Sequence, residues 1–254
     1  MKNREYWLKR AIIDDKLAEK DTNKIAKLLK KELVKTKREI KKELAYLYSD
    51  IDQSGEYSKY RLESVLSSIN SLLDNLYHKE INLLNNSLIE RYIHTYNEKV
   101  EQLGVNSSFN MLSESLVQEI VKTNWSGLTF SERIWENRRR LSFAIKSVLS
   151  NGLKRGESIQ KMSRAISSKL NVSIKDARRL VRTETCWIQT KATVDSYAKA
   201  NLTQYEFCAY LDSRTSDTCR SLDGKVFDIK DFMPGVNAPP LHPNCRSCIL
   251  PITK

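Results

Sequence analysis

Four residues near the C-terminus have the types and spacing of metal ligands. They are Cys219, His242, Cys245 and Cys248, and two residues separate His242 from Cys245 and Cys245 from Cys248. Thiolate and imidazole groups are the ligands of closed tetrahedral zinc sites, and short spacings let neighbouring side chains converge on one ion. The sequence therefore predicts one structural zinc, with Cys208 competing for the fourth position. The alternative is a metal-free cluster in which these side chains pack and hydrogen-bond.

The same residues contain the parts of a thiol hydrolase. Cys219 or Cys245 would be the nucleophile, with His242 as base and Asp212 to orient it. The spacing does not favour this arrangement, and no oxyanion-hole motif accompanies it. A catalytic zinc is also disfavoured, because four protein ligands leave no position for water.

A second polar motif is Arg-Thr-Glu-Thr at residues 182–185. An arginine and a glutamate hold the nicotinamide nucleotide in ADP-ribosyltransferases, but there they stand on separate elements and with partner motifs that this chain lacks. We therefore interpret Arg182 and Glu184 as polar support for the C-terminal region. Charge-assisted hydrogen bonds to Asp212 or Arg214 would provide that support.

The elements that position these residues are mostly helices. All five prolines lie in the last 21 residues. Proline is the residue that breaks helices most strongly, so the chain before residue 234 can form long helices. Two early segments have apolar residues at steps of three and four, separated by a turn at Asp50, Ser54 and Gly55. The first has Ile25, Leu29, Leu33, Ile40, Leu44 and Leu47; the second has Leu62, Leu66, Ile69, Leu73, Leu76 and Leu83, interrupted by Glu80. Heptad spacing in the second predicts a helical hairpin or coiled coil.

The second half of the chain is expected to hold three more helices and a small sheet. Asn151-Gly152 suits a helix end, a short helix should begin at Ser158, and Ser173 has the pattern of an N-cap for a helix ending near residue 200. The alternating aromatic stretch 204–210 predicts a strand, and Asp223-Gly224 predicts a hairpin turn into a second strand.

The expected fold class is thus mainly α. Residues 1–124 would form an elongated helical N-terminal region. Residues 125–254 would form a second domain, with helices within 130–200 and a small β/loop unit over 201–254.

The distribution of charge indicates which kinds of partner the protein binds. The chain has 43 Lys and Arg against 31 Asp and Glu, and residues 133–191 alone hold fifteen basic against four acidic residues. This density indicates a polyanion or an acidic protein surface as partner, the alternative being a solvated basic face. The candidate contact residues are Arg138, Arg139, Arg140, Arg155, Arg178 and Arg179.

No apolar run is long enough for a membrane span, and the N-terminus lacks a signal-peptide core. Five cysteines without a secretion signal favour a reducing compartment, in which clustered cysteines serve as ligands more often than as disulfides.

Five motifs in order resemble the phage Mu F-like minor head proteins, also called phage head morphogenesis proteins. The resemblance spans Trp125 to Pro251. Its motifs are Gly156-Glu157-Ser158, Arg182-Thr183-Glu184-Thr185, Asp212-Ser213-Arg214-Thr215 followed by Cys219, Leu222-Asp223-Gly224-Lys225, and Pro239-Pro240-Leu241-His242-Pro243-Asn244-Cys245-Arg246. Where relatives often have Cys-Arg-Cys or Cys-Arg-Ser-Thr, this chain has Cys245-Arg246-Ser247-Cys248, which weakens the case for Cys248 as a shared ligand.

The resemblance implies a non-enzymatic component of a tailed-phage capsid. Such proteins associate with the portal protein inside the head, are made in the host cytoplasm, and act in head assembly and genome delivery. The implied partners are the portal, phage DNA bound without sequence preference, and the scaffold or major capsid protein. The alternatives are a zinc-stapled, non-specific DNA-binding protein and, with least support, an ADP-ribosyltransferase or thiol hydrolase.

Overall fold

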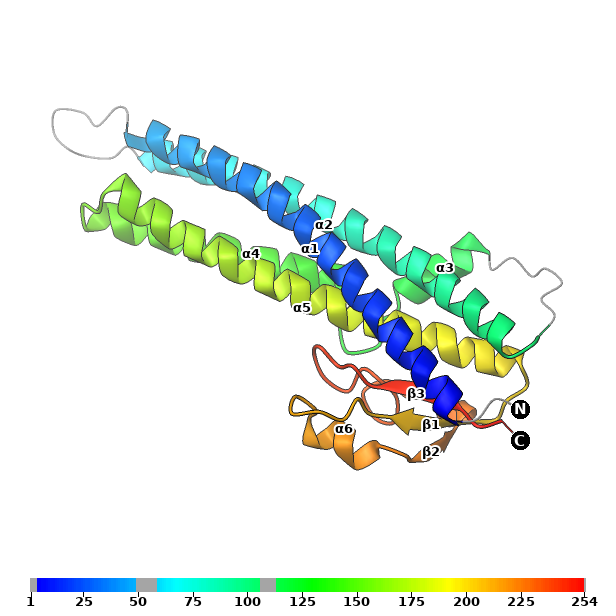
Figure 1. The fold of residues 1–254 in the computed structure, drawn as a ribbon. Coiled ribbons are helices and arrows are strands. Elements are labelled where there is room, and N and C mark those ends of the chain that lie inside the picture. Colours follow the sequence, from blue (N-terminus) through cyan, green and yellow to red (C-terminus); the bar gives the residue numbers. More distant parts are fainter. Residues whose placement is uncertain (1–3, 49–58, 106–112, 254) are drawn as a thin grey trace. The chain divides into compact units, whose positions relative to one another are not determined.

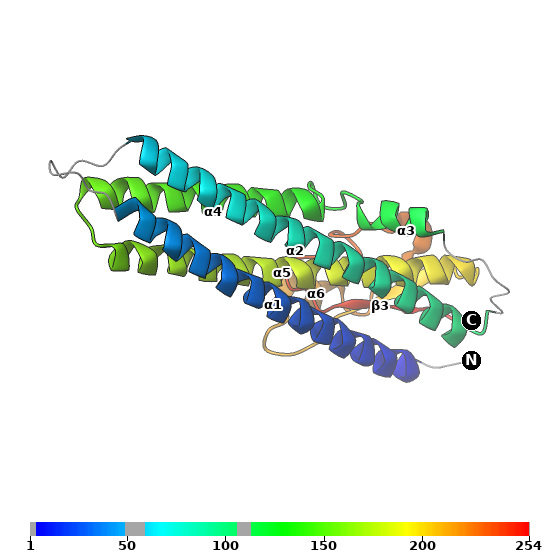
Figure 2. The ribbon, with the colours of Figure 1, turned by 90° about the horizontal axis from the view of Figure 1, so that it is seen from above.

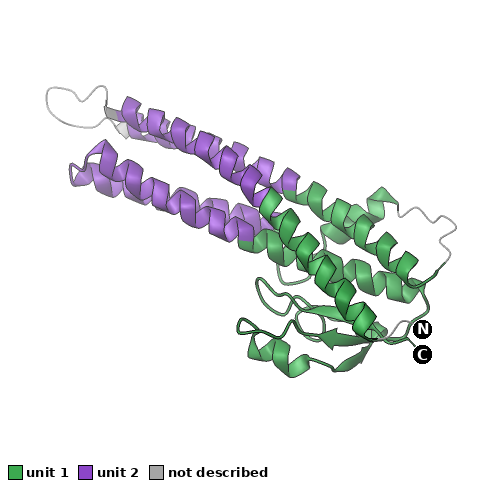
Figure 3. Ribbon diagram, in the orientation of Figure 1, with its two compact units in different colours: residues 1–24, 84–130, 179–254 green, residues 25–83, 131–178 purple. Residues whose placement is uncertain are grey.

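A computed structural model describes residues 4–48, 59–105 and 113–253, which form two compact units. Unit 1 comprises residues 1–24, 84–130 and 179–254, and unit 2 comprises residues 25–83 and 131–178 (Figure 3). Three long helices contribute to both units. The turn expected at Asp50, Ser54 and Gly55 lies outside the described residues.

Unit 2 is a four-helix bundle (Figures 1 and 2). It takes one part each from α1 (Arg4–Tyr48), α2 (Lys59–Gln102), α4 (Phe130–Lys154) and α5 (Ile159–Lys199). Cross-helix contacts include the ion pair of Lys79 with Glu32 at 2.6 Å and the hydrogen bond between Tyr77 and Ser173 at 2.7 Å.

The apolar stripe predicted for the first segment is confirmed. Its members are all buried: Ile25, Leu29, Leu33, Ile40, Leu44 and Leu47. The second stripe is corrected in part, because Leu62, Leu66 and Leu83 are only partly buried while Val65 and Leu84 are buried. Buried positions on α2 advance mostly in steps of four, so they drift away from a strict heptad line.

Glu80, which interrupts the second stripe, points into the bundle. Its side chain is 5% exposed, and within the described residues its Oε1 has no hydrogen-bond partner. Burial disfavours the charged carboxylate and raises the pKa of Glu80 to about 7. Unit 2 therefore contains a buried carboxyl group whose pKa lies near neutrality.

Two helix boundaries differ from expectation. Helix α5 runs without a break from residue 159, so Ser173 is not an N-cap; its hydroxyl faces sideways to Tyr77. Helix α4 continues through Gly152 to residue 154. The chain turns instead at Gly156, whose φ of +63° suits glycine. Gly152 allows a close helix approach, because a Cβ there would lie 2.4 Å from Sδ of Met162.

Unit 1 contains a three-stranded antiparallel sheet in the order β2-β1-β3 (Figure 1). The strands are β1 (Gln204–Cys208), β2 (Val226–Asp228) and β3 (Cys248–Pro251), with α6 (Asp217–Leu222) and η1 (Ile229–Asp231) on either side of β2 in the chain. The Asp-Gly pair does not join two strands, because α6 lies between β1 and β2; it joins α6 to β2. Gly224 has a φ of +77° and donates to the Phe207 carbonyl, while Asp223 accepts from the Ala209 amide.

Helices cover this sheet within unit 1. Trp7 near the start of α1 packs with Cys208 and Leu250, and Arg4 pairs with Glu206 of β1 at 2.7 Å. Tyr197 of α5 donates to the carbonyl of Ile249. The short helix α3 (Glu114–Val121) also belongs to unit 1.

The structure confirms a mainly helical protein with a small sheet near the C-terminus. The boundary between residues 124 and 125 stays a prediction. None of the helices in the described ranges has an apolar stretch that would cross a bilayer.

Candidate metal centre

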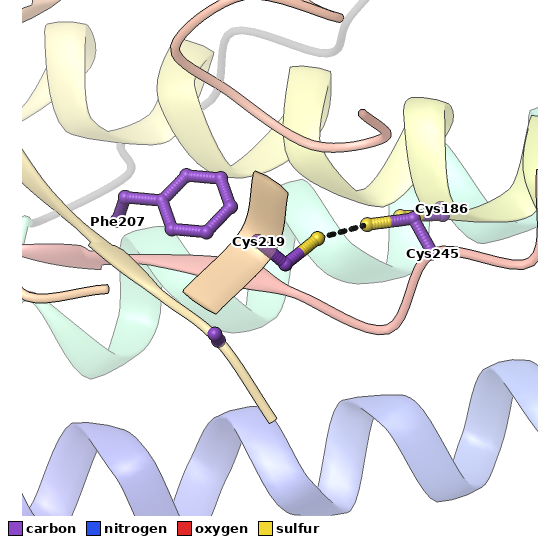
Figure 4. Close-up of a cluster of buried hydrophobic side chains, with 5 residues drawn as sticks. Cys186, Phe207, Cys219 and Cys245 are labelled. Carbon is purple, nitrogen blue, oxygen red and sulfur yellow. Dashed lines mark hydrogen bonds between the residues drawn. The ribbon is translucent and has the colours of Figure 1, made fainter. Parts of the chain in front are cut away.

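Three of the predicted ligands meet in unit 1, as the sequence led us to expect. Cys219 lies on α6, whereas His242 and Cys245 lie on the loop before β3. The Cys219 Sγ is 3.3 Å from His242 Nε2 and 3.8 Å from Cys245 Sγ. All three potential ligand atoms lie within 4.8 Å of one another. Figure 4 shows the two sulfur atoms facing each other.

The orientation of His242 fixes which ring nitrogen carries the proton. Its Nδ1 is 2.9 Å from the carbonyl oxygen of Pro243, which can only accept a hydrogen bond. Nδ1 therefore donates, and in the neutral ring Nε2 keeps its lone pair, directed at Cys219. A backbone carbonyl on the far nitrogen is the usual arrangement for a histidine ligand.

The two sulfur ligands are buried in a small cluster with Cys186 and Phe207 (Figure 4). Cys219 is 2% exposed and Cys245 is fully buried. The pKa of Cys219 is raised mainly by its hydrogen bond with Cys245 and, to a smaller extent, by burial. A hydrogen bond with Cys186 is the main cause that raises the pKa of Cys245. Both groups are therefore thiols at neutral pH when no cation is bound.

Cys248 does not belong to this cluster, which corrects the four-ligand prediction. It begins β3 and lies opposite Cys208 of β1 in the sheet register. Its Sγ is 3.7 Å from the Cys208 carbonyl oxygen, and the two cysteines share a second cluster with Trp7. The hydrogen bond with Cys208, together with burial, raises the pKa of Cys248. Strand pairing thus turns Cys248, and the competing candidate Cys208, away from His242.

The parts of a thiol hydrolase do not assemble. The His242 Nδ1 bonds to the Pro243 carbonyl and not to Asp212. Asp212 instead forms a two-point ion pair with Arg246, at 2.6 and 2.8 Å. This pair lowers the pKa of Asp212. A nucleophilic cysteine needs a lowered pKa, whereas that of Cys219 is raised.

Arg182 and Glu184 are buried on α5, but their partners differ from those we expected. Arg182 forms an ion pair with Asp15 of α1, and Glu184 accepts a hydrogen bond from the Trp125 indole at 3.0 Å. Neither of these contacts involves Asp212 or Arg214. Their charges instead connect α5 to α1 and to the segment before α4.

Two motif residues to which the sequence alone gave no role of their own, Thr183 and Arg246, hold the loop that carries His242 and Cys245. Thr183, between those charges, accepts a hydrogen bond from the Asn244 amide at 3.1 Å. Arg246 pairs with Asp212 and lies 4.8 Å above the ring of Tyr210. Asp212 therefore holds the loop through its ion pair with Arg246. Arg246 directly follows the candidate ligand Cys245 in the sequence.

The six candidate basic residues separate into two kinds. Five of them are exposed: Arg139 and Arg140 on α4, Arg155 in the turn after it, and Arg178 and Arg179 on α5. Arg138 is only 18% exposed and forms an ion pair with Asp74 inside unit 2. Its charge is therefore committed to the bundle, which corrects its assignment as a contact residue.

Comparison with known proteins finds one matching family model and two relatives. Residues 144–250 match the family described as Phage Mu protein F like protein. The chain is also 26% identical over 260 residues to the Minor head protein GP7 of Bacillus phage SPP1, covering 93% of this chain and 84% of that protein. The chain is thus homologous to a phage minor head protein over nearly its whole length.

A second relative is an enzyme. The chain is 24% identical over 231 residues to NAD(+)--arginine ADP-ribosyltransferase EFV of Enterococcus faecalis (strain ATCC 700802 / V583), covering 82% of this chain but 44% of that protein. No solved structure gives a significant match.

Proposed function

We propose that this chain, which carries a Phage Mu F-like domain at residues 144–250, is a minor head protein of a tailed phage. The observation that carries this proposal is the similarity to a minor head protein over 93% of the chain. The similarity includes both helical units, so it extends well beyond the C-terminal motifs.

The resemblance in sequence motifs supports a more specific role. The protein associates with the portal on the inside of the head, and contacts scaffold or major capsid protein as the head assembles. It is made in the host cytoplasm and stays in the virion, where it acts in genome delivery. No step of this role requires a chemical reaction.

Portal association is tested with a tagged copy of the chain, co-expressed with the portal protein from the same phage genome. Size-exclusion chromatography should move both proteins to one peak. The matched control is an unrelated helical protein with the same tag. If the chain elutes alone at every salt concentration, then portal association is wrong.

The exposed arginines support non-specific contact with DNA. Arg139 and Arg140 are adjacent on α4, and Arg155 follows at the turn after it. Lysine and arginine that neutralise phosphates release counterions, so affinity falls with salt at a slope of about 0.9 per phosphate on duplex DNA. We therefore expect retention of duplex DNA at low salt that disappears as salt rises.

The double variant Arg139→Ala/Arg140→Ala should weaken duplex binding and reduce this salt slope. Lys225→Ala/Lys230→Ala is the matched control, because it removes two exposed charges from a neutral part of the sequence. Fluorescence anisotropy with a labelled duplex measures both. Equal losses in the two variants would show that net charge alone is responsible, and no binding at low salt would assign the basic surface to a protein partner.

An arginine ADP-ribosyltransferase is the second candidate, because one relative bears that name. More than half of that relative lies outside the match, and we infer that its transferase activity resides there. The buried positions of Arg182 and Glu184 support this, because both charges are used within the fold. Incubation with labelled NAD and an arginine-rich protein should give no transfer. Transfer that is lost in Glu184→Gln, with the fold intact, would establish the enzyme.

A further inference from the structure

The geometry points to one closed zinc site in unit 1, formed by Cys219, His242 and Cys245, with Cys186 of α5 as the fourth ligand. This site differs from the one that the sequence suggests, because a helical cysteine takes the place of Cys248. It does not depend on the proposed function, and its role is structural.

The separations between the ligand atoms in the structure fit a tetrahedral zinc ion. Zinc bonds of about 2.3 Å to sulfur and about 2.0–2.1 Å to nitrogen, at tetrahedral angles, place two sulfur ligands about 3.8 Å apart. They place a sulfur and a nitrogen about 3.6 Å apart. The structure has 3.8 Å between Cys219 and Cys245, and 3.3 Å between Cys219 and the His242 Nε2. Two edges of the tetrahedron are therefore already formed.

Cys186 is the thiol placed to complete the set. It belongs to the same buried cluster as Cys219 and Cys245 (Figure 4). Its Sγ is not among the three ligand atoms that all lie within 4.8 Å of one another, so Cys186 must move closer to them as the ion binds. Its Sγ also contacts the carbonyl oxygen of Ser247, two residues beyond Cys245. Cys208 and Cys248 are paired in their own cluster with Trp7, so neither competes for this position. Three thiolates and one imidazole leave no open position, which makes the site structural.

A zinc ion here would tie together three segments that are distant in sequence. Cys186 lies on α5, Cys219 on α6, and the other two ligands lie on the loop before β3. Among the described residues, the backbone hydrogen bonds of loop 233–247 join residues of the loop to one another, as from the Cys245 amide to the His242 carbonyl. Contacts with side chains, such as that of the Asn244 amide with Thr183, connect the loop to other elements. Binding energy in such a site is folding energy, and the thiol protons are released to solvent as the ion binds.

The test is metal content of the full chain, purified reduced and without chelator, then reloaded with Zn²⁺. We expect one zinc per chain in the parent protein and in Cys248→Ser, which is the matched control. Cys245→Ser and His242→Ala should lose it. His242→Cys should recover binding, because it restores a ligand, which separates loss of coordination from loss of folding. Circular dichroism of each variant checks the helices.

Cobalt identifies the fourth ligand. The intensity of the sulfur-to-Co²⁺ charge-transfer band rises with the number of thiolates, so Cys186→Ala should weaken this band while Cys248→Ser leaves it unchanged. The proposal is overturned if the reduced parent chain takes up no zinc. The assignment of Cys186 is overturned if Cys248→Ser weakens the band and Cys186→Ala does not.

Discussion

Replacing Glu80 with glutamine should stabilise the protein at alkaline pH and leave it unchanged in acid. Glu80 is buried in unit 2, and within the described residues its Oε1 has no hydrogen-bond partner. Burial raises its pKa from 4.5 to about 7. Between pH 4.5 and about pH 7, the folded protein therefore keeps the proton on Glu80, whereas the unfolded chain releases it.

The sign and size follow from linkage. A carboxyl group with a raised pKa stabilises the fold fully below its unfolded pKa, and this contribution is lost as pH rises through the folded pKa near 7. One pKa unit corresponds to about 1.4 kcal/mol, so the free energy of unfolding should fall by up to about 3 kcal/mol between pH 4.5 and pH 8. Glutamine is neutral throughout, so Glu80→Gln removes this fall.

Urea unfolding of both proteins from pH 5 to pH 8.5 measures the difference. The matched control is Glu63→Gln, an exposed glutamate on the same helix. All three histidines remain in every variant, so the difference between the variants isolates residue 80. If Glu80→Gln keeps the slope of the parent protein, or is less stable at pH 8, the carboxylate is hydrated or partnered and the reasoning fails.

Two further variants test packing and the support of the ligand loop. Gly152→Ala should cost about 1–3 kcal/mol in thermal unfolding, because its Cβ meets Sδ of Met162, and the double variant with Met162→Ala should recover part of that loss. Asp212→Asn should speed proteolysis of the C-terminal loop at neutral pH by weakening the pair with Arg246. Because the pKa of Asp212 is lowered, that pair stabilises the fold fully above the ordinary aspartate pKa, and its contribution declines as pH falls below it. Unchanged proteolysis would show that other contacts hold the loop.

The helices were predictable because their apolar positions repeat, but their ends were not. Ser173 and Asp176 have the spacing of a cap, yet the same serine fits a helix interior when its hydroxyl bonds to Tyr77. The buried row of Met162, Ile166 and Leu170 continues to Ala177 and was the available sign of a continuous helix. Glu80 interrupted the pattern in sequence without interrupting the buried face, since burial of a carboxyl group depends on neighbours that sequence spacing does not reveal.

The candidate metal site was predictable only as far as local spacing reaches. His242 and Cys245 are close in sequence. The Pro239-Pro240 pair before them restricts the backbone, which made their approach to Cys219 a reasonable expectation. Cys186 was missed because its place beside Cys245 depends on how α5 packs on the loop. Cys248 was included because it follows Cys245 by three positions, but strand pairing with β1 sets its direction.

We propose that this chain is a minor component of a phage head. The most direct measurement is quantitative mass spectrometry of heads purified from cells that express the encoding phage genome, with the portal protein as internal standard. We predict that the chain is present in purified heads, at far fewer copies than the major capsid protein, and remains after external protease treatment. A chain found only in the soluble fraction, and absent from both procapsids and mature heads, would contradict this account.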